Sequence, residues 1–209
     1  MAFLTVVRFA QYQCPLRQFA LKGEGNMTKA LISIDYSYDF VADDGKLTAG
    51  KPAQAIEDRI AQVTQEAYDN GDYIFVAMDR HDEGDTFHPE TKLFPPHNIA
   101  GTSGRELYGK LAGVYDAIKD DNRVFWMDKR HYSAFSGTDL DIRLRERRVT
   151  TVVLTGVLTD ICVLHTAIDA YNLGYDIEVV ASATASLTPE AHDFAIGHFK
   201  NVLGATIVE

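Results

Sequence analysis

Cysteine is scarce in this chain, which has two cysteines among 209 residues. Two cysteines form one disulfide at most, so the protein is not a small scaffold held together by disulfides. The first, Cys14, lies in an N-terminal segment that we interpret as separate from the fold, which leaves Cys162 without a predicted partner. We therefore expect a reducing, cytoplasmic setting.

Basic residues are also few, because 20 Lys and Arg face 30 Asp and Glu and the formal net charge is -10. A nucleic-acid-binding protein needs a basic face to neutralise phosphates, so we expect no nucleic-acid partner. No apolar run approaches the roughly 20 residues that a helix needs to cross a bilayer, and no membrane partner is expected either. The remaining expectation is a small-molecule partner.

The first 26 residues differ in charge from the rest of the chain. They carry three basic residues but no acidic residue before Glu24, whereas the remainder is acidic. Arg8 interrupts a short apolar start, and no small-residue cleavage pattern follows, which argues against a secretory signal. We predict that residues 1–26 are an extension outside the fold and that residues 27–209 form a single domain.

Short β-rich runs alternate with helix-like stretches from Met27 onward. The runs are almost continuously apolar, which is typical of strands covered on both faces of a parallel sheet. The alternation predicts a doubly wound α/β fold, with a mostly parallel six-stranded sheet and helices on both faces. The predicted strands are Lys29–Asp35, Tyr73–Asp79, Arg123–Lys129, Thr150–Gly156, Asp176–Ala181 and Ala205–Glu209, and the predicted helices are Pro52–Asn70, Leu140–Arg147, Asp160–Leu173 and Pro189–Phe199.

Reactive side chains follow the ends of four predicted strands. Three strands end in Asp35, Asp79 and Lys129, and a fourth leads through "TGVLTDICV" to Cys162. The carboxyl ends of parallel strands meet at one edge of a sheet, where ligands bind, so these groups are predicted to converge. Singly, each charge could be a solvated cap and the cysteine a buried structural residue. Together they are the thiol, acid–base group and cation that nucleophilic catalysis requires.

The position of Cys162 predicts an activated thiol. A helix capped by Thr159 or Asp160 would place Cys162 in its first turn. The helix N-terminus and a nearby cation are expected to lower the pKa of the thiol. The free backbone N–H groups of that turn could also stabilise an oxyanion.

A long irregular stretch from residue 80 to residue 104 is rich in His, Pro and Asp. A loop of this length inside a compact domain is usually either functional or disordered. Two imidazoles and a carboxylate near it suit Zn, Fe or Mn better than Ca or Mg. The candidate ligands are Asp79, His81 and His97, while Glu90 and His88 compete for a further place.

These motifs identify a resemblance over about 180 residues. From Met27 onward the chain resembles the nicotinamidase branch of the isochorismatase-like cysteine hydrolases, a family with a Rossmann-like three-layer fold. The resemblance lies in "ISIDYSYDF", "AMDRH", "FPPHNIAGTSG", "MDKRHYSAFSGTDL" and "TGVLTDICV", in this order. It implies a catalytic triad of Asp35, Lys129 and Cys162, metal ligands Asp79, His81 and His97 with Glu90 preferred as the fourth, and a cis peptide bond between Val157 and Leu158.

The resemblance further implies a reaction. Nicotinamide would bind with its ring nitrogen on one divalent transition metal ion, zinc first and iron or manganese as alternatives. A thioester intermediate would then lead to nicotinate and ammonia in NAD salvage, and pyrazinamide is expected to react as well. Members of the family often assemble, so a homo-oligomer is an open expectation. The implied substrate-binding residues are Phe40, Phe94 and Tyr132, which would flank the ring, and Leu158, whose N–H would join that of Cys162 in holding the oxyanion.

Two departures and three rival functions accompany the resemblance. Some members use a histidine soon after the Asp-x-His motif as a further ligand, and the spacing differs here, which is why Glu90 is preferred over His88. The family often has Trp-Pro-Pro-His-Cys where this chain has Phe94-Pro-Pro-His97-Asn98. An isochorismate-type ether hydrolase would lack Cys162 and the metal loop. A carbamoyl or ureido amidase would share the triad and usually lack the metal ligands. A non-catalytic metal-binding protein would leave the triad unexplained.

Overall fold

The computed structural model describes residues 28–209, so the predicted extension of residues 1–26, with Cys14, lies outside the described residues. The described chain forms one six-stranded sheet with the order β3-β2-β1-β4-β5-β6, and every pair of neighbouring strands is parallel. The strands are β1 (Thr28–Ile34), β2 (Tyr73–Asp79), β3 (Val124–Lys129), β4 (Val149–Val157), β5 (Asp176–Ala185) and β6 (Thr206–Val208).

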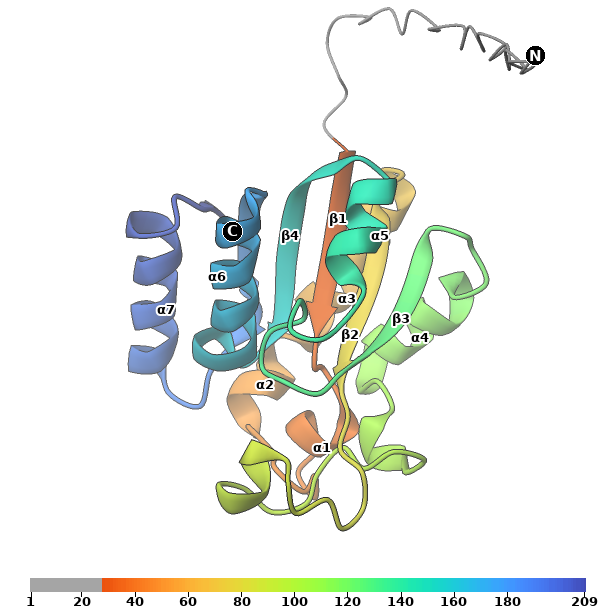
Figure 1. Ribbon diagram of the computed structural model, residues 1–209, viewed down its shortest axis with the longest axis vertical. Coiled ribbons are helices and arrows are strands. Elements are labelled where there is room, and N and C mark those ends of the chain that lie inside the picture. The colour runs from red at the N-terminus through yellow and green to blue at the C-terminus, as the bar shows by residue number, and fades with distance from the viewer. Residues whose placement is uncertain (1–27) are drawn as a thin grey trace, which may run out of the picture.

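Helices cover both faces of the sheet, which confirms the predicted three-layer α/β fold (Figure 1). One apolar layer lies between the sheet and three helices, α5 (Leu140–Glu146), α6 (Leu164–Leu173) and α7 (Pro189–Asn201). A second layer lies against α2 (Lys51–Ala55), α3 (Glu57–Asp69) and α4 (Gly109–Ile118). None of the helices in residues 28–209 is both long and apolar enough to span a bilayer.

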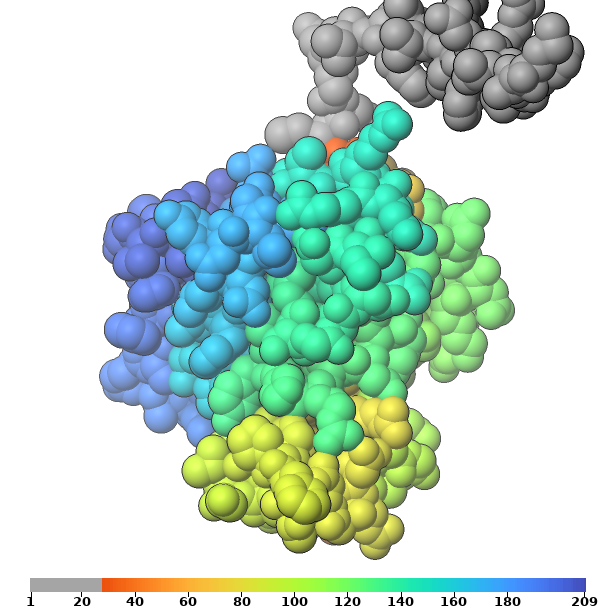
Figure 2. Space-filling view, viewed as in Figure 1, coloured from red at the N-terminus to blue at the C-terminus, as the bar shows by residue number. Residues whose placement is uncertain are grey.

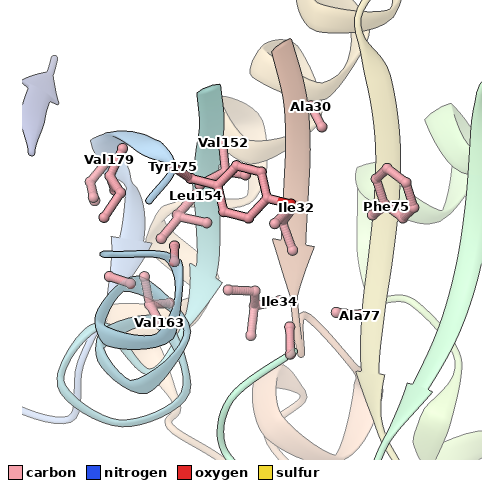
Figure 3. Packing of buried hydrophobic residues seen from close by; sticks show 14 of the residues in the cluster. Ala30, Ile32, Ile34, Phe75, Ala77, Val152, Leu154, Val163, Tyr175 and Val179 are labelled. Carbon is pink, nitrogen blue, oxygen red and sulfur yellow. The ribbon is translucent and has the colours of Figure 1, made fainter. Parts of the chain in front are cut away.

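The central strand β1 shows why the strands read as continuous apolar runs. Successive side chains of a strand point to opposite faces. Accordingly, Ile32 and Ile34 pack into the layer beneath α5 and α6 (Figure 3), while Leu31 packs into the layer beneath α3. All three side chains are fully buried. A strand with two buried faces has no polar positions to alternate with, so its apolar pattern is unbroken.

The helices on one face of the sheet differ from the prediction at two places. The single helix predicted over Pro52–Asn70 is two helices, because Ile56 leaves the helical conformation at φ -90° and ψ 1° and separates α2 from α3. Helix α4 was not predicted. It begins at Gly109, whose φ is 57°, and contains Gly113, so two poor helix formers weaken its local signal.

The connections at the carboxyl edge of the sheet carry short helices. These are α1 (Tyr38–Val41) after β1, and two 3-10 turns, η1 (Pro89–Lys92) and η2 (Ser103–Arg105), after β2. In Figure 2 the long loop after β2, coloured yellow to yellow-green, forms the lower end of the molecule. The stretch predicted as one irregular loop is therefore ordered by local turns and lies at the edge where ligands of parallel sheets bind.

Candidate active site

The register of the central strands brings the predicted residues to one point. Ile34 of β1 pairs with both Ala77 of β2 and Gly156 of β4, so the three strands end together. On the other side of β2, Asp79 pairs with Lys129 of β3. The residue after β1, Asp35, turns the chain with a φ of 54°, a left-handed conformation that Asp tolerates better than most residues.

Gly156 allows the closest approach between β4 and β1. Its φ is 113°, and a Cβ at this position would lie 1.9 Å from the Ile34 carbonyl oxygen. A larger residue would push the strand ends apart at the point from which Asp35 and the turn of Cys162 emerge. The glycine of "TGVLTDICV" is therefore required by geometry.

A buried carboxylate, ammonium group and thiol meet at these strand ends. Lys129 Nζ lies 2.7 Å from Asp35 Oδ2 and 3.6 Å from Cys162 Sγ. It also donates to the carbonyl oxygen of His131 at 3.0 Å. The second oxygen of the carboxylate, Asp35 Oδ1, accepts the backbone N–H of Asp79 at 2.7 Å. Both charged side chains are almost completely buried, so the charge of each is balanced mainly by the charge of the other.

Burial and charge perturb the pKa values of this pair. Burial raises the pKa of Asp35 from the usual 3.8 to about 6, although Lys129 opposes the shift. Burial alone would lower the pKa of Lys129, but the charges of Asp35, Cys162 and Asp79 raise it above its ordinary range. Lys129 is therefore a permanent cation, and Asp35 is a carboxyl group that can gain or lose a proton near neutral pH.

The turn that carries Cys162 differs from the predicted helix start. Residues Thr159–Val163 form a π-helical turn, η3, which precedes α6, and no side chain caps it. The predicted caps have other partners, since Thr159 Oγ1 lies 2.9 Å from His192 Nδ1 and Asp160 Oδ1 accepts from Ser186 Oγ at 2.7 Å. These contacts tie the turn to α7 and to the loop that precedes it. The peptide bond before the turn, Val157–Leu158, is cis, as the resemblance implies.

The expected lowering of the thiol pKa is wrong. Burial raises the pKa of Cys162 well above the ordinary value of a thiol, although Lys129 lowers it in part. The side chain is only 8% exposed, and desolvation penalises the thiolate more than one nearby cation favours it. The uncomplexed protein therefore holds a neutral thiol, which needs a base to become a nucleophile. Asp35 lies beside the same Lys129 ammonium group, and its pKa of about 6 suits this role.

A second cluster of side chains surrounds Asp79. His81 Nε2 lies 2.9 Å and His97 Nε2 3.4 Å from Asp79 Oδ2. Glu90 Oε2 lies 3.7 Å from His97 Nε2 and 4.0 Å from His81 Nε2. All four side chains are buried. Asp79, His81 and His97 lie close enough together to hold one ion, as do His81, His88 and Glu90, and imidazoles and carboxylates are donors that divalent transition metals prefer.

The hydrogen bonds of His97 leave one nitrogen available for a ligand. His97 Nδ1 lies 2.8 Å from the Pro95 carbonyl oxygen, which can only accept, so Nδ1 carries the proton. His97 Nε2 then presents a lone pair. This buried atom makes no hydrogen bond with any group in residues 28–209. An unpartnered nitrogen of this kind, aimed at two carboxylates, fits a metal ligand.

Hydrogen bonds also distinguish Glu90 from His88. His88 Nε2 contacts the carbonyl oxygen of Arg130, and its Nδ1 accepts the backbone N–H of Glu90 at 3.3 Å. Both ring nitrogens are thus engaged, although the ring lies beside His81 with centroids 4.5 Å apart. The Glu90 carboxylate is turned toward His81 and His97 instead. The geometry therefore favours Glu90 as the fourth ligand.

A cavity of about 160 Å³ connects the thiol to this cluster. It is smaller than the roughly 300–1,000 Å³ of sites for drug-sized ligands, and suits a single-ring molecule. Its lining is largely apolar. Besides Cys162, Asp79 and Glu90, the lining includes all four predicted substrate-binding residues, Phe40, Phe94, Tyr132 and Leu158, and residues that the sequence did not indicate, Leu47, Thr48, Ala49, Val157, Ile161 and Leu187.

Polar residues behind the cluster, Arg105, Asp39 and Asn98, were also missed. Arg105 Nε donates to the Asp79 carbonyl oxygen at 2.9 Å. Asp39 accepts the backbone N–H of Asn98 at 2.8 Å, and Asn98 Nδ2 donates to Asp79 Oδ2 at 3.3 Å. These contacts join residues tens of positions apart in the chain, so no local spacing signals them. The one sign of this region in the sequence was Asn98, which stands where the family that the chain resembles often has cysteine.

The fold and the site define a three-layer α/β enzyme with its site at the carboxyl edge of the sheet. The model of the isochorismatase domain matches residues 29–208, and the chain belongs to the isochorismatase family.

Solved structures of relatives support this assignment. The pyrazinamidase/nicotinamidase of Streptococcus mutans UA159 is 81% identical, with a TM-score of 0.86 over 87% of this chain and 100% of its own. The nicotinamidase/pyrazinamidase PncA of Bacillus subtilis is 55% identical, with a TM-score of 0.86 over 88% of this chain and 100% of its own. The pyrazinamidase of Pyrococcus horikoshii, solved in complex with zinc, is 27% identical, with a TM-score of 0.75 over 87% and 98% of the two chains.

Proposed function

We propose that this protein is a nicotinamidase, which hydrolyses nicotinamide to nicotinate and ammonia. The observation that carries the proposal is the meeting of two groups of side chains at one small apolar cavity. The thiol of Cys162 stands beside Asp35 and Lys129, and the same cavity reaches Asp79 and Glu90 of the second cluster. The names of the similar nicotinamidases support this substrate.

The first half of the reaction uses the buried pair. Asp35 accepts the thiol proton, and Lys129 stabilises the thiolate 3.6 Å away. The sulfur attacks the carboxamide carbon, and the negative charge that develops on oxygen is held by the N–H groups of Leu158 and Cys162. Asp35 then gives its proton to the departing nitrogen, which leaves as ammonia, and a thioester remains.

The second half restores the thiol. Asp35, again a carboxylate, removes a proton from a water molecule as its oxygen attacks the thioester carbon. The carbon–sulfur bond breaks, nicotinic acid forms and loses its carboxyl proton to solvent as nicotinate, and the thiolate regains its proton from Asp35. A base with a pKa of about 6 suits both directions of proton transfer at neutral pH.

Asp79, His81, Glu90 and His97 would hold a divalent ion, because the buried His97 Nε2 has a free lone pair and faces two carboxylates. A bound ion would supply a Lewis acid that orients the ring nitrogen of the substrate. The protein itself supplies the nucleophile. Zinc is our first choice, supported by the zinc complex of a related pyrazinamidase, with iron and manganese as alternatives.

The charge of the cavity favours neutral carboxamides. Among the residues that line it, the charged side chains are acidic, and the nearby Lys129 is neutralised by Asp35 at 2.7 Å. A divalent ion bound at Asp79 and Glu90 would offset these two charges without leaving an excess of positive charge, so substrates with a carboxylate, as N-carbamoyl and ureido acids have, would gain no net attraction there. Nicotinamide and pyrazinamide share an uncharged ring and a carboxamide, so we expect both to react.

A purely metal-binding role would not require the rest of the site. Burying Asp35 and Lys129 beside a thiol carries a desolvation cost that holding an ion does not explain. We therefore favour the enzyme, which would act in NAD salvage in the cytoplasm.

The test is ammonia release from nicotinamide, measured with and without a chelator, with an N-carbamoyl amino acid as the comparison substrate. Release from nicotinamide that a chelator suppresses is the expected result. Release only from the N-carbamoyl substrate would overturn the proposal.

A further inference from the structure

Asn98 stands out as a buried polar residue that the proposed reaction does not use. It is fully buried, directly follows His97, and has a φ of 44°. Its carbonyl oxygen accepts the backbone N–H of His81 at 3.1 Å. The main chain of Asn98 therefore joins the two histidines of the cluster, and Asn is one of the few residues that adopt this left-handed conformation readily.

The side chain of Asn98 reaches the centre of the same cluster. Its Nδ2 donates to Asp79 Oδ2 at 3.3 Å, the oxygen that also faces His81 Nε2 and His97 Nε2. A carboxylate can only accept hydrogen bonds, so the NH₂ group, and not the amide oxygen, must face Asp79. Asn98 Oδ1 is buried and has no hydrogen-bond partner in residues 28–209. The Asn98 amide therefore holds the Asp79 carboxylate through Nδ2, although its own oxygen is left without a hydrogen bond.

Asp39 fixes the position of Asn98 from behind. Asp39 Oδ2 accepts the Asn98 backbone N–H at 2.8 Å, and Asp39 Oδ1 accepts the backbone N–H of Lys46 at 3.2 Å. The Asp39 side chain is itself buried, and a Cβ on Gly104 would lie 2.2 Å from Asp39 Oδ2. The carboxylate is therefore enclosed, and it links the segment after His97 to the loop that begins the wall of the cavity.

We infer that Asn98, held by Asp39, is a positioning residue for the metal carboxylate of Asp79. The amide restrains Asp79 Oδ2, so that this oxygen stays aimed at the point where His81 and His97 converge. Outer partners of this kind typically change metal affinity by about 10–100-fold when they are removed. The inference rests on the metal site of the proposed function.

The deletion that isolates the side chain is Asn98→Gly. Glycine adopts a φ of 44° without strain, so the backbone bonds to Asp39 and His81 are expected to remain. The matched control is Arg148→Gly, which also replaces a residue of positive φ, 57°, but at an exposed position that precedes β4. Both variants and the parent protein would be titrated with Zn²⁺ against a chromophoric chelator and, separately, with Co²⁺ while the visible spectrum is recorded.

We expect Asn98→Gly to bind Zn²⁺ about 10–100-fold more weakly and to show a shifted Co²⁺ spectrum, with Arg148→Gly unchanged. A merely structural role would leave the Co²⁺ spectrum as it is. Parental affinity and spectrum in Asn98→Gly would overturn the inference while leaving the metal site standing. Absence of Zn²⁺ binding by the parent protein would instead overturn the metal site itself, and the inference with it. If the glycine variant does not fold, Asn98→Asp, which tolerates the same backbone conformation and lacks the NH₂ donor, is judged by the same two measurements.

Discussion

Because the ion pair between Lys129 and Asp35 is buried, we predict that removing one partner lowers the stability of the folded protein strongly. Lys129→Met keeps a long unbranched side chain but removes the ammonium group 2.7 Å from Asp35 Oδ2. The carboxylate, which is 0% exposed, would then lose its main counter-charge. Breaking a buried pair from one side costs about 3–5 kcal/mol. For a domain of this size that corresponds to a fall in Tm of roughly 6–20 °C.

The sign of the pH dependence follows from Asp35. Its pKa in the folded protein is already raised from 3.8 to about 6 by burial, and removing Lys129 raises it further. A carboxyl group with a raised folded pKa contributes stability that is fully present below its unfolded pKa and is lost as the pH rises through its folded pKa. The deficit of Lys129→Met should therefore be largest above pH 6 and shrink toward pH 4.

The measurement is thermal unfolding followed by circular dichroism at several pH values, with a chelator present so that ion binding does not contribute. Lys119→Met is the matched control, because Lys119 also lies 2.7 Å from a carboxylate, that of Asp116, but on the surface. Its removal should change stability far less than that of Lys129, because solvent screens an exposed pair. The double variant Lys129→Met with Asp35→Asn should recover most of the loss. Equal Tm values for the two single Lys variants would refute the argument from burial.

Three further predictions concern the reaction and the metal. Cys162→Ala should abolish ammonia release from nicotinamide while leaving the metal content measured by atomic absorption unchanged, and retained turnover would rule out the thiol as nucleophile. The value of kcat/KM should fall as the pH drops below about 6, because protonated Asp35 can no longer accept the thiol proton; a flat acid limb down to pH 5 would contradict this. Glu90→Gln should weaken Zn²⁺ binding by about 10-fold or more, whereas His88→Gln should weaken it less. If a chelator titration gives the reverse order, His88 and not Glu90 is the fourth ligand.

The strands and the two clusters of reactive side chains could be predicted from the sequence because their signals are local. Each strand is a short apolar run, and Asp35, Asp79 and Lys129 stand directly at the ends of three of them. In a parallel sheet the carboxyl ends of the strands lie at one edge, so residues at those ends are expected to lie near one another in space. The apolar packing in Figure 3 and the layers in Figure 1 add little that this pattern did not already imply.

The protonation state of the Cys162 thiol was decided by the tertiary structure. A helix start and a nearby lysine suggested a lowered pKa for Cys162, but the folded chain buries the sulfur, and desolvation outweighs the cation. The same holds for the π-helical turn around Cys162, whose predicted caps pair with His192 and Ser186 instead. Burial is a property of the whole packed molecule, so no local segment of the sequence encodes it.

The sequence by itself therefore determined which side chains gather at the edge of the sheet, and the tertiary structure decided how each is held there. It turned Glu90 toward the histidines while engaging both nitrogens of His88. It also placed Asn98 against Asp79 through a contact with Asp39, 59 positions away in the chain. Apolar periodicity and strand ends act over a few residues, whereas hydrogen-bond partners and desolvation are set by groups that meet only when the chain is folded.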